Sequence, residues 1–147
     1  MNGLVKTSAI LVLLSSLVPC SFGDPCTLSP HGNDAPAYSS INDIFPNNTC
    51  KNGTIRWNYP RGSLRVHFKF EDESRKFKVC LFDAYGPPYD YALDMTSGEK
   101  VNFQLPHELG GISCTNTIAS EIVLRLMAPF TGVHSYMNQY SYKLVFQ

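Results

Sequence analysis

Hydrophobic and polar side chains alternate along most of the chain, beginning shortly after residue 50. In residues 55–59 and again in residues 64–70, every second side chain is apolar. A period of two places alternate side chains on opposite faces of a β-strand, and the intervening Pro60, Arg61 and Gly62 are typical of a turn. The pattern therefore predicts a β-hairpin with one buried face and one solvated face.

The same alternation continues towards the C-terminus. Residues 77–82 carry apolar side chains at nearly every position, which indicates a central strand covered on both faces. Residues 112–127 are rich in β-branched side chains, and this favours a strand over the alternative of a helix. Further alternating sets are Tyr89, Tyr91, Leu93 and Met95; Val101, Phe103 and Leu105; Ile122, Leu124 and Leu126; and Tyr140, Tyr142, Leu144 and Phe146. About seven to nine short strands without a long helical repeat predict an all-β sandwich.

The first 48 residues lack this alternation. Residues 24–48 are rich in Pro, Ser, Asn and Asp, which predicts a surface loop with at most one short strand. Residues 1–23 resemble a secretory signal: Lys6 precedes an apolar core too short to span a bilayer, and Ser21 and Gly23 are small residues before the expected cleavage site. We expect a signal peptide over residues 1–23 and a single domain over residues 24–147. A membrane anchor is the alternative interpretation of the leader.

Charge and cysteine content narrow the classes of protein. The chain has 12 basic and 12 acidic residues, and this balance gives no general attraction to nucleic acid. Once Cys20 leaves with the leader, four cysteines remain, and an even number in a secreted chain predicts two disulfides. Three pairings are open, but order and spacing favour Cys26 with Cys50 and Cys80 with Cys114, because each closes a moderate loop around neighbouring strands. Zinc is the alternative, but the closely spaced Cys or His pairs that it requires do not occur.

Other motifs concern modification and catalysis. Two N-glycosylation sequons, at Asn47 and Asn52, flank Cys50 and are consistent with a secreted protein. The sequence has no G-x-S-x-G motif, and His107 and Glu108 are not part of an H-E-x-x-H motif. The four histidines are scattered at His31, His67, His107 and His134. We therefore predict that the protein is not an enzyme, with a secreted hydrolase as a less favoured alternative.

The stretch from Cys50 to Glu71 resembles a known family. Its sequence, CKNGTIRWNYPRGSLRVHFKFE, is similar to the second-cysteine region of CUB domains, which are extracellular β-sandwiches. Within that group it is most similar to the N-terminal CUB-like domain of the meteorin and meteorin-like secreted factors. The run C-L-F-D at residues 80–83 resembles the third-cysteine motif of CUB domains, and the cysteine order matches the sequential pairing of that family. The gap between Cys80 and Cys114 is longer than in most CUB domains, Trp57 lies further from the second cysteine, and we expect no netrin-like second domain.

The resemblance implies a fold and a function. The fold would be a CUB-like antiparallel β-sandwich of the jelly-roll type with two disulfides. The function would be that of a secreted binding module, a soluble signalling factor that contacts an extracellular protein or a sulfated glycan and needs no cofactor. The alternative is a calcium-dependent recognition or adhesion module. Some CUB domains bind calcium at positions that correspond here to Glu71, Asp72, Glu73 and Asp83, and carboxylate oxygens suit calcium; otherwise this acidic run is a solvated turn.

The basic side chains of the expected hairpin are candidates for partner binding. Arg56, Arg65, His67 and Lys69 all lie opposite the apolar set, where they would form one stripe for an acidic partner or a sulfated glycan. The alternative is that they form only the solvated face of an antiparallel sheet. Trp57 lies on the apolar side, so we expect it in the core.

Overall fold

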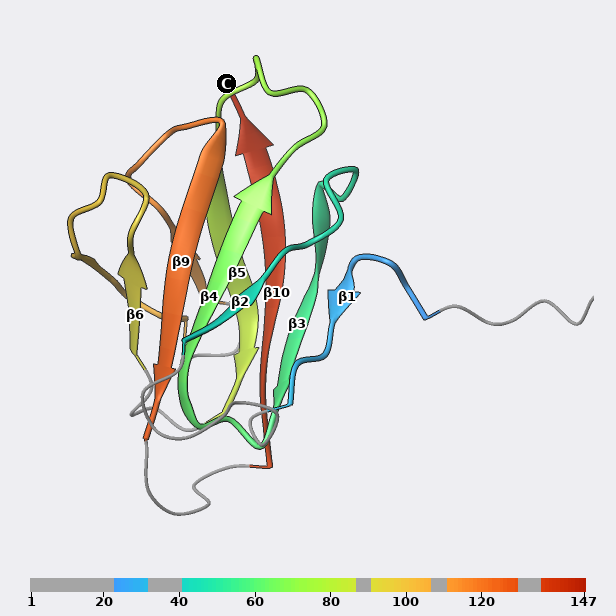
Figure 1. Cartoon of the computed structure of the whole chain (residues 1–147), viewed down its shortest axis with the longest axis vertical. Helices are drawn as coiled ribbons and strands as arrows, with labels where there is room; N and C mark the ends of the chain where they lie inside the picture. The colour runs from blue at the N-terminus through green and yellow to red at the C-terminus, as the bar shows by residue number, and fades with distance from the viewer. Residues whose placement is uncertain (1–22, 32–40, 87–90, 107–110, 130–135) are drawn as a thin grey trace, which may run out of the picture.

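Two five-stranded β-sheets pack face to face in the computed structural model of the chain, which describes residues 23–31, 41–86, 91–106, 111–129 and 136–147 (Figure 1). Apart from Gly23, the expected signal peptide lies outside the described residues. The described part contains no helix. The strands are β1 (Thr27–Leu28), β2 (Ile41–Ile44), β3 (Asn52–Asn58), β4 (Gly62–Lys69), β5 (Phe77–Tyr85), β6 (Tyr91–Asp94), β7 (Val101–Phe103), β8 (Ile112–Cys114), β9 (Glu121–Ala128) and β10 (Met137–Phe146). The prediction of an all-β sandwich is confirmed.

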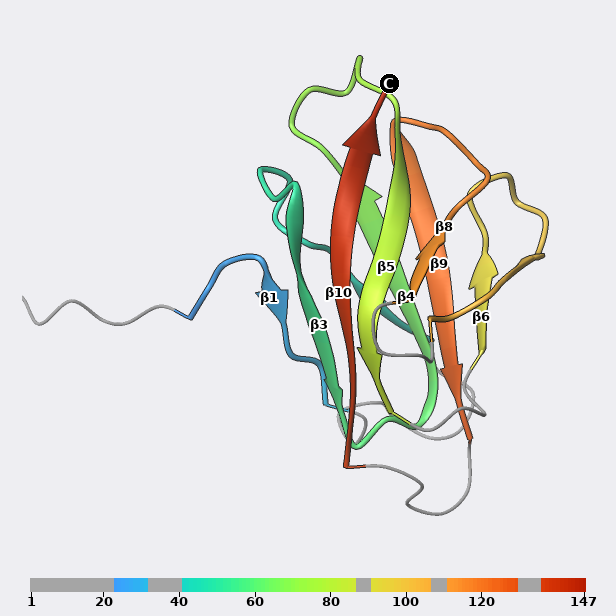
Figure 2. The ribbon, with the colours of Figure 1, turned by 180° about the vertical axis from the view of Figure 1, so that it is seen from behind.

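The strands are divided between a front sheet and a back sheet. The front sheet, which faces the viewer in Figure 1, has the order β2-β4-β9-β6-β7, and the back sheet, which faces the viewer in Figure 2, has the order β1-β3-β10-β5-β8. Most neighbours are antiparallel, but β1 pairs with β3 and β2 pairs with β4 in parallel. These two edge strands come from the segment that was expected to be a loop with at most one short strand. The sandwich is therefore mainly antiparallel, with one short parallel strand at an edge of each sheet.

The predicted hairpin is not present, although both of its strands are. β3 pairs with β1 and β10 in the back sheet, whereas β4 pairs with β2 and β9 in the front sheet. The chain therefore crosses from one sheet to the other between Asn58 and Gly62. Tyr59 and Gly62 adopt left-handed backbone conformations at this crossing, with φ angles of 47° and 72°. Alternation shows which side chains are buried, but two strands that face each other across a core have the same pattern as two strands that pair within a sheet.

The hydrophobic core fills the space between the two sheets. Trp57, Tyr142 and Phe68 are its largest fully buried side chains, and the rings of Phe68 and Tyr142 meet edge to face with centroids 5.1 Å apart. Trp57 is only 2% exposed, which confirms its prediction as a core residue. Since each fully buried large apolar side chain contributes about 1.5–3 kcal/mol, this cluster is the main source of stability.

Strand β6 is placed one residue out of phase with its expected alternation. Tyr91 was expected on the apolar side, but it is 54% exposed, and the inward positions are those of Ala92 and Asp94. These two residues pair with Leu126 and Leu124 of β9, which both point into the core. The pairing with β9 fixes the inward face of β6 and places a carboxylate between the sheets.

Candidate binding surfaces

Two disulfides brace the back sheet, and their pairing is the one that the cysteine order favoured. Cys26 is bonded to Cys50, and Cys80 is bonded to Cys114. Cys80 and Cys114 lie directly opposite each other on the neighbouring strands β5 and β8. Two disulfides within a chain of this size are typical of extracellular proteins.

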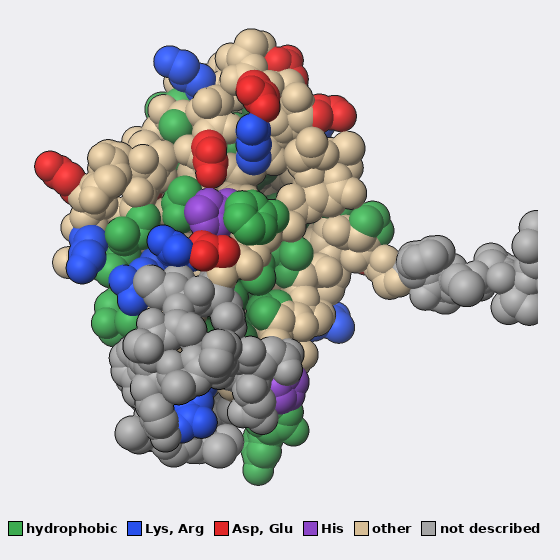
Figure 3. Space-filling model, in the orientation of Figure 1, with side chains coloured by type: hydrophobic (Ala, Val, Ile, Leu, Met, Phe, Trp, Pro, Cys, Tyr) green, Lys and Arg blue, Asp and Glu red, His purple; other side chains and the backbone are tan. Residues whose placement is uncertain are grey.

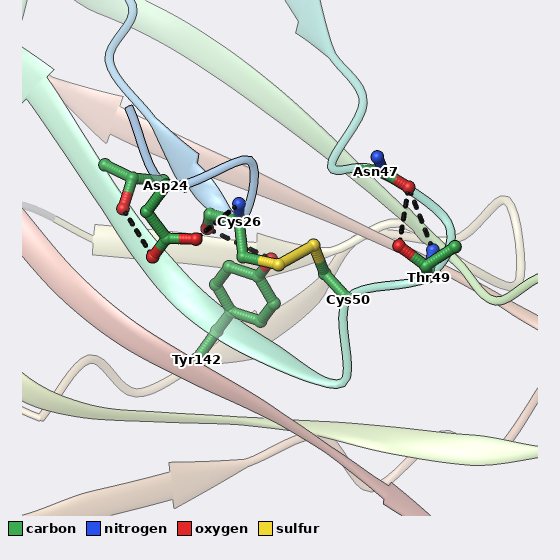
Figure 4. The surroundings of a disulfide bond; sticks show 7 residues. Asp24, Cys26, Asn47, Thr49, Cys50 and Tyr142 are labelled. Atoms are coloured by element: carbon green, nitrogen blue, oxygen red, sulfur yellow. Dashed lines mark hydrogen bonds between the residues drawn. A yellow bond between two sulfur atoms is a disulfide. The ribbon is translucent and has the colours of Figure 1, made fainter. Parts of the chain in front are cut away.

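The Cys26–Cys50 disulfide lies in a closely packed corner of the molecule (Figure 4). The backbone N–H of Cys26 donates to Oδ1 of Asp24 at 3.0 Å, and the hydroxyl of Tyr142 approaches the carbonyl oxygen of Cys26 at 3.4 Å. Burial, together with the nearby charge of Asp24, raises the pKa of Tyr142 to about 12. The corner therefore links the start of the described chain to the middle of the back sheet.

Both predicted glycosylation sites are exposed. Asn47 lies in the loop before Cys50, where its Oδ1 accepts hydrogen bonds from the backbone N–H of Thr49 at 3.0 Å and from the hydroxyl of Thr49 at 2.9 Å (Figure 4). Asn52 begins β3 and lies directly opposite Lys143 of β10. A glycan on Asn47 would extend from a loop, whereas one on Asn52 would extend from the outer face of the back sheet.

The front sheet carries a cluster of charged side chains on its outer face. Nη2 of Arg65 donates to Oδ2 of Asp43 at 2.8 Å, and Nε of Arg65 lies 2.7 Å from Oδ1, without the alignment of a hydrogen bond. Nε2 of His67 lies 2.7 Å from the same Oδ1, and Nδ1 lies 3.3 Å from Oε1 of Glu121. The ring of Phe45 stacks on His67 with centroids 4.7 Å apart. A histidine surrounded by acidic and basic side chains is visible near the middle of this face in Figure 3.

Two cations of the front face, Arg65 and Lys69, are therefore largely neutralised by their neighbours, whereas Arg125 of β9 donates from Nε to the hydroxyl oxygen of Ser63 at 2.7 Å. The guanidinium of Arg65 is the main cause of a lowered pKa at Asp43, with a smaller contribution from His67. Nζ of Lys69 lies 2.8 Å from Oε1 of Glu73; this hydrogen bond raises the pKa of Lys69 and lowers that of Glu73. Charges that are already paired have less attraction left for a partner.

The outer face of the back sheet differs in this respect. Arg56 lies there, where its Nε donates to the amide oxygen Oε1 of Gln139 at 3.1 Å. Lys78 and Lys143 lie on the same face, on β5 and β10, and none of these three cations forms an ion pair with an acidic side chain in the described part of the chain. The predicted single stripe is thus wrong: Arg56 is on one side of the sandwich, and Arg65, His67 and Lys69 are on the other. The stripe divides because β3 and β4 belong to different sheets.

The predicted calcium ligands are dispersed. Asp72 accepts hydrogen bonds from the backbone and hydroxyl of Ser74, which lower its pKa, and Glu73 is paired with Lys69. Asp83 lies on β5, separately from the turn that contains Glu71. Within the described residues, no three His, Cys, Asp or Glu side chains are placed to hold a metal ion together. The acidic run behaves as a solvated turn.

The two histidines in the described residues are far apart in the fold. His31 packs against Tyr59 with ring centroids 5.0 Å apart and ring planes tilted by 45°, at the end of the sandwich where the chain crosses between sheets. His67 lies on the front face, and its ring is held between two carboxylates. His107 and His134 lie outside the described residues. Sequence patterns missed Asp43 and Glu121, the partners of His67, because both lie far from it along the chain.

Comparisons with protein-family models and with curated proteins find no match for this chain. Among the described residues, no helix has the length and apolar character needed to cross a membrane.

Proposed function

We propose that this protein is a secreted, non-enzymatic binding module of the meteorin type, which contacts a sulfated glycan through the outer face of its back sheet. The two disulfides and the exposed sequons support an extracellular location. The observation that carries the choice of surface is the difference between the two faces. On the front face Arg65 and Lys69 are paired with carboxylates, and Arg125 donates to the hydroxyl oxygen of Ser63. On the back face none of Arg56, Lys78 and Lys143 forms an ion pair with an acidic side chain among the described residues.

The spacing of these cations suits an extended polyanion. Along β10, the row that contains Arg56 and Gln139 is four residues from Lys143, a distance of about 13 Å at the usual rise of a strand. Lys78 lies one outward row further, opposite Val145. Hydroxyl side chains of Thr54 and Ser141 lie between the rows and offer hydrogen bonds to sugar oxygens. Guanidinium and ammonium groups bind sulfate through charge-assisted hydrogen bonds.

The test is binding to heparin, used as a sulfated probe, at several salt concentrations. The variant K78Q/K143Q should bind about tenfold more weakly than the wild type, because each exposed contact of this kind contributes up to about 1 kcal/mol. The matched control K69Q/K100Q removes the same charge from the front sheet and its edge, and its affinity should stay within about twofold of the wild type. Equal losses in both variants would mean that only net charge matters. No binding by the wild type would exclude the sulfated glycan as partner.

Secretion has its own test. The chain expressed in animal cells should appear in the medium with an N-terminus near Asp24. Retention in the membrane fraction with residues 1–23 still attached would support the anchor interpretation instead.

A further inference from the structure

A polar pocket of about 270 Å³ lies at the side of the sandwich, between the edge strands of the two sheets. β7 ends the front sheet and β8 ends the back sheet, and residues of both strands line the pocket. The polar side chains that line the pocket are those of Asp94, Asn102, Gln104, Ser113 and Asn116. The pocket is separate from both faces discussed above.

Asp94 is the distinctive group in this pocket. It occupies an inward position of β6 and is only 4% exposed. Its Oδ1 accepts two hydrogen bonds from Thr96, one from the backbone N–H at 3.0 Å and one from the hydroxyl at 2.6 Å. Its Oδ2 has no hydrogen-bond or ion-pair partner among the described residues, and none of the described residues that line the pocket is basic.

The carboxylate of Asp94 has apolar neighbours on its inner side. The neighbouring inward residues, Ala92 on β6 and Leu124 on β9, are apolar, and a buried carboxylate lowers stability unless a cation or several hydrogen bonds compensate it. Thr96 compensates one oxygen only. The other oxygen faces the pocket, where it can accept hydrogen bonds from a cationic ligand, and a cation held against the protein surface is attracted more strongly than in bulk water.

We propose that this pocket binds a guanidinium group, such as an arginine side chain of a partner protein. A guanidinium has five N–H donors in one plane, so it can pair with Asp94 and also donate to the amide oxygens of Asn102, Gln104 and Asn116. Val101 and Phe103 provide apolar surface for the aliphatic part of such a side chain. A single carboxylate matches a monovalent cation, whereas calcium requires six or more oxygen ligands, usually with several carboxylates.

The test compares two ligands of nearly the same shape, N-acetyl-arginine amide and its neutral analogue N-acetyl-citrulline amide. Each is titrated at millimolar concentrations into the secreted, isotope-labelled protein, and amide chemical shifts are followed by NMR. The arginine derivative should shift the resonances of Asp94, Asn102, Gln104 and Ser113 and bind at least tenfold more tightly than the citrulline derivative. The variant Asp94→Asn should remove this preference.

Two further measurements keep the test decisive. If Asp94→Asn fails to fold, Ser113→Leu, which retains the carboxylate and fills the pocket, should abolish the same shifts. Equal binding of the two derivatives, shifts elsewhere on the molecule, or no shift at all overturns the proposal. Calcium chloride alone producing the same set of shifts would also overturn it, since the pocket would then be a metal site. These outcomes are independent of heparin binding to the back face.

Discussion

Asp43 on the edge strand β2 forms an ion pair with Arg65 on β4, with Oδ1 and Oδ2 lying 2.7 and 2.8 Å from two guanidinium nitrogens. The same carboxylate lies 2.7 Å from Nε2 of His67. β2 has only four residues, and its parallel ladder with β4 is its sole pairing within the described sheet. The side chain of Asp43 therefore holds β2 against β4 in addition to the short ladder of backbone hydrogen bonds.

The variant Asp43→Asn should destabilise the protein by about 1 kcal/mol at neutral pH, the upper end for a pair that is partly exposed. It should also expose β2 to protease, because the strand loses its attachment to Arg65. Urea unfolding and limited proteolysis measure the two effects. Glu99→Gln is the control, since Glu99 is exposed and forms no ion pair in the described structure. An unchanged unfolding midpoint in Asp43→Asn would show that the pair is only a surface contact.

Asp43 should also make the stability of the protein depend on pH. The pKa of Asp43 is lowered in the folded protein from its ordinary value of 3.8, which means that the ionised carboxylate stabilises the folded state. Its contribution is complete above pH 3.8 and declines as the pH falls through the lower folded value. The stability difference between wild type and Asp43→Asn should therefore shrink on acidification below about pH 4, as measured by thermal unfolding at a series of pH values. A difference that stays constant down to pH 2 would contradict the assignment.

Much of the fold could be predicted from the sequence, because alternation reports burial directly. Ile55, Trp57, Leu64 and Val66 are all in the core as expected, and the order of the cysteines pointed to their pairing. The sheet to which each strand belongs could not be predicted. That choice depends on partners far along the chain, β10 for β3 and β9 for β4.

The candidate surfaces were harder to predict for the same reason. The outward direction of Arg56 and Arg65 followed from alternation, but the pairing of Arg65 with Asp43 depends on β2, which lies in a segment without periodicity. Asp94 was missed because the alternation of Tyr89, Tyr91, Leu93 and Met95 suggested the opposite phase. The contact with β9 decides this phase, and a local pattern contains no information about it.

We expect protein stability to be sensitive to substitution of Gly53, which lies next to the corner shown in Figure 4. A Cβ atom at this position would overlap the carbonyl oxygen of Cys26 and come within 2.7 Å of the hydroxyl of Tyr142. Gly53→Ala should therefore destabilise the protein by about 2 kcal/mol or more, because the backbone of Cys26 is held by the disulfide and cannot move easily. Thermal unfolding measures the effect. Glu99→Ala, at an exposed residue without an ion pair in the described structure, should leave the melting temperature unchanged; equal effects of the two changes would rule out the steric explanation.

Tyr142 predicts a loss of stability in alkali. Its pKa is raised from 10.0 to about 12, mainly by burial, so its hydroxyl stays protonated in the folded chain after it ionises in the unfolded chain. The unfolded state is therefore favoured increasingly as the pH rises above 10. Tyr142→Phe, which cannot ionise, should unfold at a higher pH than the wild type, whereas Tyr136→Phe, at a side chain that is 77% exposed, should not. Ionisation of Tyr142 together with the exposed tyrosines in an ultraviolet titration would refute the burial argument.

The position of Asn52 opposite Lys143 connects glycosylation to the proposed glycan-binding face. A glycan attached to Asn52 would extend over Lys143 and hinder a polyanion from reaching it, whereas a glycan on Asn47 extends from a loop. Asn52→Gln should therefore increase the affinity of the glycosylated protein for heparin, and Asn47→Gln should not. Mass spectrometry of both sites establishes which of them carry glycan in the wild type. An occupied Asn52 whose removal leaves heparin binding unchanged would show that Lys143 does not contact the polyanion, and the binding surface would then have to lie away from this row of the back sheet.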